Sequence, residues 1–381
     1  MNDYSEALPA YRTIRMIRQP GPIAAFAEEE AWRARKDYPR LMGSGLPTYF
    51  YTRERDMGGW EILGVGGETP QGARDSLAAR FRQTAAMDGK TSLQRKKLTA
   101  AAEKLDWVRL DEMKVLGRRY RVVRAEPFIR MGPDGPEPPR PSDPDPADTG
   151  DAERRPDPVT GFVIDPYTGT GVSEGLLRFD LSQFVTKAGG PVPKEMCEDS
   201  KRARYTHPGA VLLPVAFGVA EKVDGRWRPH SGPSGTPQDA RETLAMYFRV
   251  FGPVQEEWSE EVREVYREAA ERLDAKRGMG VVAAGRRFRV VRIERMIRIG
   301  PDGPEPPRPS DWDPDPPIGP HVQQLKEAGE WREEDEMEPP SEEALEMHEL
   351  LKEELARRES LQQQRRARAE EARRARPAPP E

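Results

Sequence analysis

The twelve-residue stretch GPDGPEPPRPSD occurs twice in this chain, at residues 132–143 and again at residues 300–311, without a single difference. Proline lacks a backbone N–H group and fixes its own φ angle, so neither stretch can form a helix interior or a central strand. Each residue before a proline is also pushed toward an extended conformation. An extended segment that recurs unchanged indicates an internal duplication, and this duplication limits the architectures that the chain can adopt.

The duplication reaches well beyond these two segments. When the chain is shifted against itself by 167 to 168 residues, residues 117–131 and 285–299 agree at ten of fifteen positions. Upstream, TPQGARDSLAARFR at residues 69–82 matches TPQDARETLAMYFR at residues 236–249. Each copy is therefore about a hundred residues long, which is the size of a small domain.

Each copy begins with a predicted hairpin. Residues 46–55 and 213–223 are rich in aromatic and β-branched side chains, which favour strands. In the second copy, Asp224 and Gly225 follow the first strand directly. This pair tolerates the positive φ angles of a tight turn, so it predicts a two-residue hairpin connection.

Two helices should follow the hairpin. Thr69 and Thr236 each precede a proline. This pairing is typical of a helix start, because threonine caps free N–H groups and proline fits the first turn. A second helix is clearest in the second copy, where it begins behind Ser259. Its expected buried face consists of Trp258, Val262, Val265, Ala269 and Leu273.

An arginine-rich strand closes each copy. In residues 119–131, the alternation of apolar side chains changes phase between Val122 and Val123, and the second copy repeats the change at Val290 and Val291. A strand that changes its buried face must contain a bulge or be covered on both sides. We expect one of these two arrangements in both copies.

Together these elements predict an α+β fold, with two tandem ββααβ-type modules, mostly antiparallel sheets, Pro-rich linkers and a charged C-terminal helix or tail. A helix should precede each module, at residues 23–36 and 194–204. The sequence RMIR at residues 15–18 also occurs at residues 295–298, inside the second arginine strand. We therefore expect one extra strand near the N-terminus.

The domain boundaries are expected to follow the two copies. The expected regions are a first module with an N-terminal strand and helix at 1–131, a Pro/Asp-rich linker at 132–160, a second module at 161–299, a Pro/Asp-rich segment at 300–320, and a charged helical or disordered tail at 321–381. In the tail, Met347, Leu351 and Leu355 share one face of an expected helix that starts near Ser341. This helix can be solvated, or it can dock onto a partner or form a short coiled coil.

The overall composition limits the classes of function. Only 36% of residues are apolar while 33% are charged and 39 are proline, so part of the chain must stay solvated. The net charge of -5 gives no general attraction to nucleic acid or anionic lipid. Cys197 is the single cysteine, which excludes an internal disulfide, and no apolar stretch is long enough to span a membrane. We expect a soluble, cytoplasmic protein.

The arginine strands form the candidate interaction surface. Arginine beside an aromatic side chain on a sheet can bind phosphates and stack on bases, which is typical of nucleic-acid binding. Alternatively, the guanidinium groups pair with glutamates on the helices of the same module. The candidate residues are Arg118, Arg119, Tyr120, Arg121 and Arg124 in the first copy and Arg286, Arg287, Phe288, Arg289 and Arg292 in the second.

The proline-rich segments also allow two interpretations. They can be short spacers, or they can lie against their own modules or a partner in a polyproline II conformation. In the second case, the first segment could stack on aromatic side chains such as Tyr49, Tyr51 or Trp60. The candidate residues are Pro138, Pro139, Arg140 and Pro141 in the first segment and Pro306, Pro307, Arg308 and Pro309 in the second.

Other patterns give little support for catalysis. Residues 64–67, GVGG, lie between an expected strand and helix and could hold an anion, but no P-loop lysine follows, so a plain connection is the simpler interpretation. Cys197 and His207 could act as nucleophile and base, but Glu30 and Arg40 take these positions in the first copy. No HExxH, CxxC or GxGxxG motif occurs. We expect no catalytic residues, no cofactor and no metal site.

Two resemblances to known families add to this interpretation. The strand, turn, strand and G-x-T-x-x-x-A order around Gly67, Thr69 and Ala73 is similar to the small ββα units of HicB-like antitoxins. Over its full length, the chain resembles an uncharacterised actinobacterial family in which an arginine-rich strand precedes a GPDGPEPPRPSD segment, here residues 117–143 and 285–311. This second resemblance implies a soluble bacterial protein without an assigned activity.

The sequence therefore predicts a non-enzymatic protein–protein interaction or scaffold protein built on a duplicated module. Duplicated modules raise avidity without new chemistry. Its partner is expected to be a protein of unknown identity, and no membrane partner is expected. The alternative is a nucleic-acid-binding protein that uses the two arginine strands.

Overall fold

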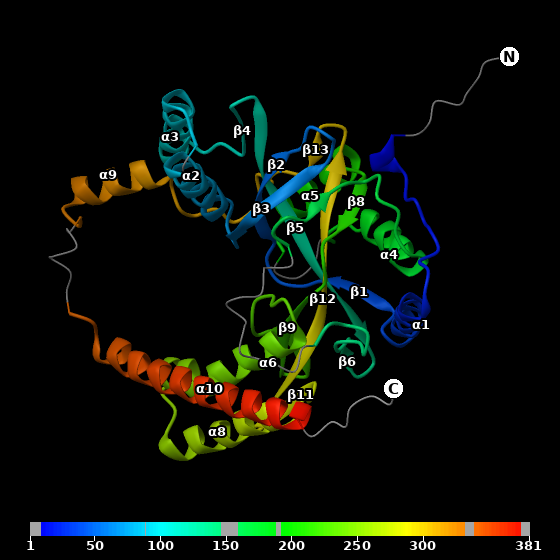
Figure 1. Ribbon diagram of the computed structural model, residues 1–381, viewed down its shortest axis with the longest axis vertical. Helices are drawn as coiled ribbons and strands as arrows, with labels where there is room; N and C mark the ends of the chain where they lie inside the picture. The colour runs from blue at the N-terminus through cyan, green and yellow to red at the C-terminus, as the bar shows by residue number, and fades with distance from the viewer. Residues whose placement is uncertain (1–8, 88, 146–158, 188–191, 332–338, 375–381) are drawn as a thin grey trace. The chain divides into compact units, whose positions relative to one another are not determined.

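A computed structural model describes residues 9–87, 89–145, 159–187, 192–331 and 339–374 (Figure 1). The fold is α+β, with helices and antiparallel strand pairing, as predicted. The contacts divide the chain into two compact units. Unit 1 consists of Met1–Pro133, Asp157–Val215 and Ile293–Asp335, and unit 2 consists of Asp134–Pro156, Ala216–Arg292 and Glu336–Glu381.

The division differs from the expected boundaries, because the units follow contacts and the expected boundaries follow the copies. The first proline segment, defined here as residues 134–145, belongs to unit 2 together with strands of the second copy. The second proline segment, residues 302–313, belongs to unit 1 together with strands of the first copy. Of the expected linker at 132–160, residues 146–158 lie outside the described residues.

Unit 1 contains most of the strands of the first copy. Its elements are η1 (Ala10–Arg12), α1 (Pro22–Asp37), β1 (Arg40–Gly43), β2 (Thr48–Glu54), β3 (Trp60–Gly67), α2 (Pro70–Ala86), α3 (Ser92–Trp107), β4 (Glu112–Val115), β5 (Arg118–Gly132), β7 (Val163–Ile164), α4 (Val172–Ser182), α5 (Lys194–Thr206), β8 (Gly209–Leu212), residues 293–300 of β12, β13 (Gly303–Pro304) and α9 (Ile318–Ala328).

The sheet of unit 1 is built around β5. In this sheet β5 lies between β12 and β2, followed by β3 and β7, while β1 and β4 also pair with β5. On one face, Phe50, Val123 and Ile297 belong to a large apolar cluster. On the other face, Tyr49 and Val122 pack against Ala73 of α2. The expectation for the arginine strand is therefore confirmed in the form of a strand covered on both faces, since residues 121–126 are all buried.

Unit 2 contains the hairpin and helices of the second copy. Its elements are β6 (Gly135–Pro136), β9 (Ala216–Val223), β10 (Arg226–Pro229), α6 (Pro237–Met246), the π-helix η2 (Tyr247–Phe251), α7 (Gly252–Gln255), α8 (Glu260–Ala275), β11 (Gly280–Ala283), residues 286–292 of β12 (Arg286–Gly300) and α10 (Glu342–Arg374).

The core of unit 2 is aromatic. Phe248 lies 5.1 Å from Phe288 and 5.0 Å from Tyr266, measured between ring centroids. Trp258 stacks on Tyr266 at 3.8 Å. These contacts join η2, α8 and β12, and Figure 1 shows α6, α8 and α10 lying along one another in this part of the chain.

Several local predictions are confirmed. The hydroxyl of Thr69 accepts a hydrogen bond from the Gly72 N–H group, and that of Thr236 accepts one from the Asp239 N–H group. The hairpin turn at Asp224 has the expected positive φ, 50°. The helices expected at 23–36 and 194–204 are α1 and α5. For the two threonine caps and the turn, a short-range rule determined the structure, so one sequence was sufficient to find it.

The expected buried face of α8 is confirmed at Trp258, Ala269 and Leu273, and Val262 is half-buried. It fails at Val265, which is 41% exposed, whereas Tyr266 is buried and stacks on Trp258. Near the N-terminus, Met16 makes a single parallel bridge to Thr170, so residues 9–21 contain no extra strand.

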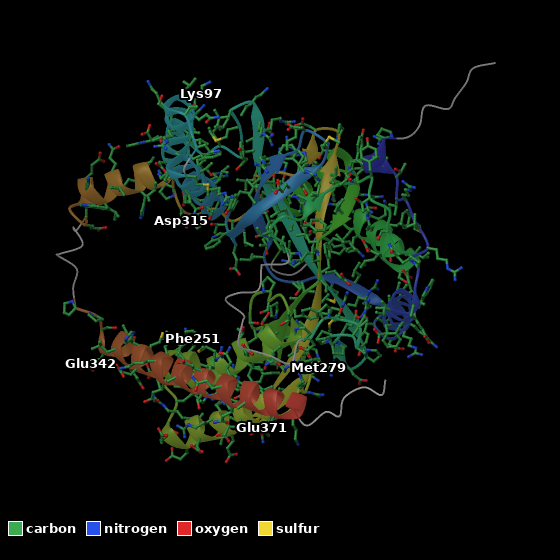
Figure 2. The ribbon with its side chains drawn as sticks, in the orientation of Figure 1. Lys97, Phe251, Met279, Asp315, Glu342 and Glu371 are labelled. Carbon is green, nitrogen blue, oxygen red and sulfur yellow. The ribbon has the colours of Figure 1, made fainter. Side chains whose placement is uncertain are left out.

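The charged tail forms helix α10, whose ends lie near Glu342 and Glu371 (Figure 2). In the expected stripe, Met347 and Leu351 are half-buried and Leu355 is 54% exposed. Glu354 is 3% exposed, and its carboxylate accepts hydrogen bonds from Arg357 and Arg358 of α10 and lies 3.5 Å from Arg249 of η2. None of the helices in the described part of the chain combines the length and apolar character needed to cross a membrane.

Candidate functional site

The second proline segment runs through unit 1 as an extra strand-like piece between β5 and β12. The Arg124 N–H group donates to the Glu305 carbonyl at 3.0 Å, and the Glu305 N–H group donates to the Arg298 carbonyl at 2.9 Å. The side chain of Arg121 adds a hydrogen bond to the Pro304 carbonyl at 2.9 Å. The segment is therefore bound partly through its main-chain N–H and carbonyl groups, as extended peptides are when they bind at sheets.

The first proline segment makes the corresponding contacts in unit 2. The Arg292 N–H group donates to the Glu137 carbonyl at 2.9 Å. The side chain of Arg289 donates to the Pro136 carbonyl at 3.1 Å. Arg289 and Arg292 occupy the same positions in the second copy as Arg121 and Arg124 in the first. Both units thus bind the same part of the repeated sequence, and they do so with arginines at equivalent positions of their arginine strands.

Aspartates at the end of each segment fix its register. In unit 1, Arg124 donates from Nε to Asp311 at 2.9 Å, and Arg74 donates to Asp313 at 2.7 Å. Arg74 lies on α2 and is 4% exposed. Because these guanidinium groups are buried, each aspartate neutralises a charge that would otherwise be costly.

The same pair of contacts occurs in unit 2. Arg292 donates from Nε to Asp143 at 3.1 Å, and Arg241 of α6 donates to both oxygens of Asp145 at 2.8 Å. Arg241 is 1% exposed. Arg74, Arg241 and the second aspartate of each pair were missed in the sequence. The signal was present, since Arg74 and Arg241 fall at one position of the matched stretches 69–82 and 236–249.

The candidate arginine of each segment donates to the glutamate of the same segment. Arg308 donates to Glu305 at 2.7 Å and to Glu126 of β5 at 2.8 Å. Arg140 donates to Glu137 at 2.6 Å. Of the candidate prolines, Pro139 is buried, Pro138, Pro306 and Pro307 are half-buried, and Pro141 and Pro309 are exposed.

Each segment turns against a tryptophan at its second glycine. Gly303 has a φ of 116°, and a Cβ atom there would lie 2.6 Å from Nε1 of Trp60. Gly135 has a φ of 128°, and its Cβ atom would lie 2.4 Å from Nε1 of Trp227. Only glycine fits such a close approach at a positive φ. This contact explains why the glycine belongs to the repeated sequence.

The structure corrects the expected docking. A segment packs in the unit that holds strands of the other copy, rather than against its own module. The contact with an aromatic ring is made by glycine and involves Trp227 for the first segment, where stacking of prolines on Tyr49, Tyr51 or Trp60 was expected. The sequence could not show which segment packs in which unit, because the two segments are identical.

A buried charged cluster holds the second segment in unit 1. Glu126 lies 2.7 Å from Arg124, 2.8 Å from Arg308 and 3.7 Å from Arg298. Burial alone would raise the pKa of Glu126, but the three guanidinium groups lower it to about 2. Burial and the neighbouring Asp311 carboxylate raise the pKa of Tyr49 above its usual range. The cluster is therefore arranged for holding charges in place.

The candidate arginines of the first copy are bonded to carboxylates. Arg118 donates to Asp56 at 2.8 Å, Arg119 to Glu112 at 2.7 Å and Arg121 to Glu112 at 2.6 Å. Tyr120 packs edge to face with Phe81 at 4.9 Å. The expected partners were glutamates on the helices. The observed partners come from a hairpin turn, a strand and the proline segment.

The second copy differs at Arg287 and Arg289. Arg286 donates to Glu221 at 2.7 Å and to Glu256 at 2.9 Å, Phe288 is buried, and Arg292 is bonded to Asp143. Arg287 is exposed, with its guanidinium carbon 5.8 Å from the Trp227 ring centroid. The arginine strand of unit 2 therefore keeps an exposed guanidinium group.

The remaining sequence candidates have structural roles. Residues 64–67 belong to β3 and not to a connection, and a Cβ atom on Gly66 would lie 2.3 Å from Cα of Ala73 in α2. Gly66 therefore lets the helix approach the strand closely. Cys197 is buried on α5, and the described hydrogen bond of the His207 ring is with Thr206. Within the described residues, no group of three or more His, Cys, Asp or Glu side chains could hold a metal ion.

A groove of about 400 Å³ lies in unit 2 between η2, α8 and α10. The arginines of its lining are paired: Arg249 lies 2.7 Å from Asp274, and Arg263 lies 2.8 Å from Glu346. We therefore assign it to the packing of α10.

Comparison with known families gives a match over most of the chain. A family model described as "Family of unknown function (DUF5954)" matches residues 21–314. The matched range begins just before α1 and ends just after the second proline segment, so it contains both segments and the strands that bind them. No curated protein and no solved structure matches the chain.

Proposed function

Because this chain belongs to DUF5954, a family of unknown function, we propose its function from its own contacts: it is a non-enzymatic scaffold for protein–protein interactions, built on two sites that bind extended Pro- and Asp-rich segments. The observation that supports this proposal is the agreement between the two sites. Arg121 and Arg289 bind the carbonyl group before the segment glutamate, and Arg124 and Arg292 bind the same aspartate of the repeated sequence.

The chemistry of the sites favours recognition of a chain segment. Main-chain hydrogen bonds accept any extended peptide, while the buried arginines select carboxylates at fixed positions. In unit 1, these are Asp302, Asp311 and Asp313. A proline-rich segment loses little conformational entropy on binding, because it is already extended when free.

The same chemistry argues against catalysis at these sites. A general acid or base needs a pKa near the working pH, and the arginines around Glu126 move its pKa far below that range. A nucleophilic cysteine needs access to substrate, and Cys197 is buried. A free buried thiol and the absence of other cysteines fit a reducing cytoplasm, which we take as the location of the protein.

A peptide added in trans tests the proposal. The probe is a labelled peptide with the sequence of residues 300–313, GPDGPEPPRPSDWD, and the protein is the full chain with Asp311→Ala, which weakens the internal segment. We expect fluorescence anisotropy to show binding to this variant. The wild-type chain should bind the peptide at least about tenfold more weakly than the variant does. Its own segment competes for the site at an effective concentration near the millimolar range.

A scrambled peptide of the same composition is the control. Equal binding of both peptides, or no binding of either one, would overturn the proposal. If Asp311→Ala unfolds the chain, the milder Asp313→Asn variant serves instead, because Arg74 keeps its second partner, Asp111, at 2.7 Å. In either variant, the matching peptide should also raise the melting temperature.

Nucleic-acid binding is the second candidate function. The observation that favours it is the exposed Arg287 beside Trp227, since a cation next to an aromatic ring can bind a phosphate and stack on a base. A gel-shift series with a single-stranded oligonucleotide tests it. Binding that weakens steeply between 50 and 200 mM salt, roughly as expected for several phosphate contacts, supports this function, and no binding at low salt removes it.

A further inference from the structure

Unit 1 surrounds a pair of arginines with three carboxylates. Arg119 and Arg121 lie with their guanidinium carbons 5.2 Å and 4.9 Å from the centroid of the Trp60 ring. The carboxylate of Glu112 accepts hydrogen bonds from both arginines, as does that of Asp302, and Glu54 lies 3.7 Å from Arg119. Two positive and three negative charges meet here, so the pair is fully neutralised by the chain itself.

Unit 2 repeats the arginines and the tryptophan. Arg287 and Arg289 lie with their guanidinium carbons 5.8 Å and 5.1 Å from the centroid of the Trp227 ring. Arg289 is also held by its hydrogen bond to the Pro136 carbonyl. The two units therefore share the geometry of two guanidinium groups beside an indole ring.

Unit 2 lacks the carboxylates of this arrangement. Glu112 pairs with Arg121 across the sheet in unit 1, and the residue that pairs with Arg289 is Gly280. Glu54 pairs with Trp60, and the residue that pairs with Trp227 is Lys222. One acid is thus missing. The repeat counterpart of Glu54 is Glu221, whose carboxylate is bonded to Arg286, and an exposed lysine lies opposite Trp227.

The third carboxylate of unit 1, Asp302, corresponds to Asp134 in the repeat. Asp134 is exposed, and among the described residues no carboxylate forms an ion pair with Arg287 or Arg289. Counting each ionised side chain as one unit of charge, the three cations Arg287, Arg289 and Lys222 and the carboxylate of Asp134 together carry a net charge of about +2. In unit 1, the two arginines and their three carboxylates together carry about -1. We call Lys222, Trp227, Arg287 and Arg289 the open arginine cluster.

We propose that the open arginine cluster is a binding site for an acidic segment of a partner protein, whose Asp or Glu carboxylates take the places that Glu54, Glu112 and Asp302 fill in unit 1. This inference rests on the proposed scaffold function and names the chemistry of the partner. Unit 1 is the template for the ligand, because there the same two arginines and tryptophan hold carboxylates. A planar guanidinium group binds a carboxylate through two parallel N–H groups. Stacking on the indole ring holds the two guanidinium groups in place.

A labelled hexaglutamate peptide tests the site on the wild-type full chain, with hexaglutamine as the uncharged control. Binding is measured by fluorescence anisotropy at 50 mM salt. Arg287→Gln should weaken hexaglutamate binding about tenfold, because a charge-assisted pair with an exposed guanidinium is lost. Arg118→Gln in unit 1 is the matched control, since Arg118 is also exposed and already bonded to Asp56. It should leave the binding unchanged.

A reverse variant installs the charge that unit 1 has. Lys222→Glu places an acid opposite Trp227, as Glu54 lies opposite Trp60, and it should abolish hexaglutamate binding. Lys222 and Arg287 are exposed, so the melting temperature of both variants should stay within about 2 °C of the wild-type value. Circular dichroism checks this.

The outcomes separate this inference from the proposed function. No hexaglutamate binding by the wild-type chain, or equal loss with Arg118→Gln and Arg287→Gln, overturns the inference alone. A single-stranded oligonucleotide that binds the cluster about tenfold more tightly than hexaglutamate also overturns it and supports the second candidate function. Failure of the proline peptide with intact hexaglutamate binding overturns the proposed recognition of proline segments alone.

Discussion

Arg124 and Asp311 are 187 residues apart in sequence, yet the Nε–H group of Arg124 donates to both carboxylate oxygens of Asp311, at 2.9 and 3.0 Å. Both side chains are almost fully buried. The first copy of the repeat supplies the arginine and the second supplies the aspartate. Unit 1 is therefore completed by a segment from the second copy. In unit 2 the roles are exchanged, because Arg292 of the second copy binds Asp143 of the first copy.

This contact predicts that Arg124→Ala lowers the free energy of unfolding of unit 1 by about 3 to 5 kcal/mol, because it removes the guanidinium group that pairs with the buried Asp311 carboxylate and one of the three that surround Glu126. Urea denaturation followed by circular dichroism measures the effect. Arg33→Ala is the control, since the Arg33 to Glu29 pair on α1 is exposed and worth about 0.5 kcal/mol or less. Similar effects of both substitutions would contradict the assigned role of Arg124.

The glycine contacts predict a steric effect. Gly303→Ala should destabilise the chain by about 2 to 4 kcal/mol, because the new methyl group meets Trp60 and the backbone φ is strained. Gly329→Ala has a similar strain at φ 74° but open space around it, and should cost only about 1 kcal/mol. Thermal unfolding measures both. If the two variants have the same melting temperature, the packing of Gly303 on Trp60 is not what requires glycine.

The lowered pKa of Glu126 predicts acid sensitivity. The pKa is about 2 in the folded chain and 4.5 for an unperturbed glutamate. As pH falls below 4.5, the unfolded chain takes up a proton first, so the stability that ionised Glu126 contributes is present above pH 4.5 and is lost as pH falls toward 2. Glu126→Gln should be less stable at pH 7 and should lose this part of the pH dependence.

Denaturation midpoints between pH 7 and pH 3 measure the difference between wild type and Glu126→Gln. Glu261→Gln is the control, because Glu261 is exposed on α8 and its bond is to Ser259. Its curve should follow the wild type closely. Parallel curves for wild type and Glu126→Gln would show that the three arginines do not act on this carboxylate.

Glu354 predicts how α10 is held in unit 2. Glu354→Ala removes the carboxylate that contacts Arg249, Arg357 and Arg358, so α10 should detach more often. Limited trypsin digestion should cleave this arginine-rich helix about tenfold faster, which corresponds to about 1.4 kcal/mol of lost docking free energy. Leu355→Ala, next to it and exposed, should digest like the wild type. Equal digestion of the two variants would argue against the assigned contact.

Local features of the fold could be predicted from the sequence because short-range rules decide them. The Thr69 cap, the turn at Asp224 and the covering of both faces of β5 follow from side chains within a few residues. The face of α8 was predicted correctly at Trp258, Ala269 and Leu273, but not at Val265, because Tyr266 packs on Trp258 instead. The arginine strands were identified as important, but their partners were not, since ion pairs across the repeat have no signature in a single sequence.

The sequence by itself determined that two identical extended segments exist, that glycine and aspartate recur in both, and that an arginine strand precedes each one. Only the tertiary structure decided which segment fills which site, and that Gly280 and Lys222 leave unit 2 without the carboxylates of unit 1. The physical reason is that twelve identical residues offer the same hydrogen bonds and charges to either site. Their local energies cannot distinguish the two pairings, and the path of the whole chain makes the choice.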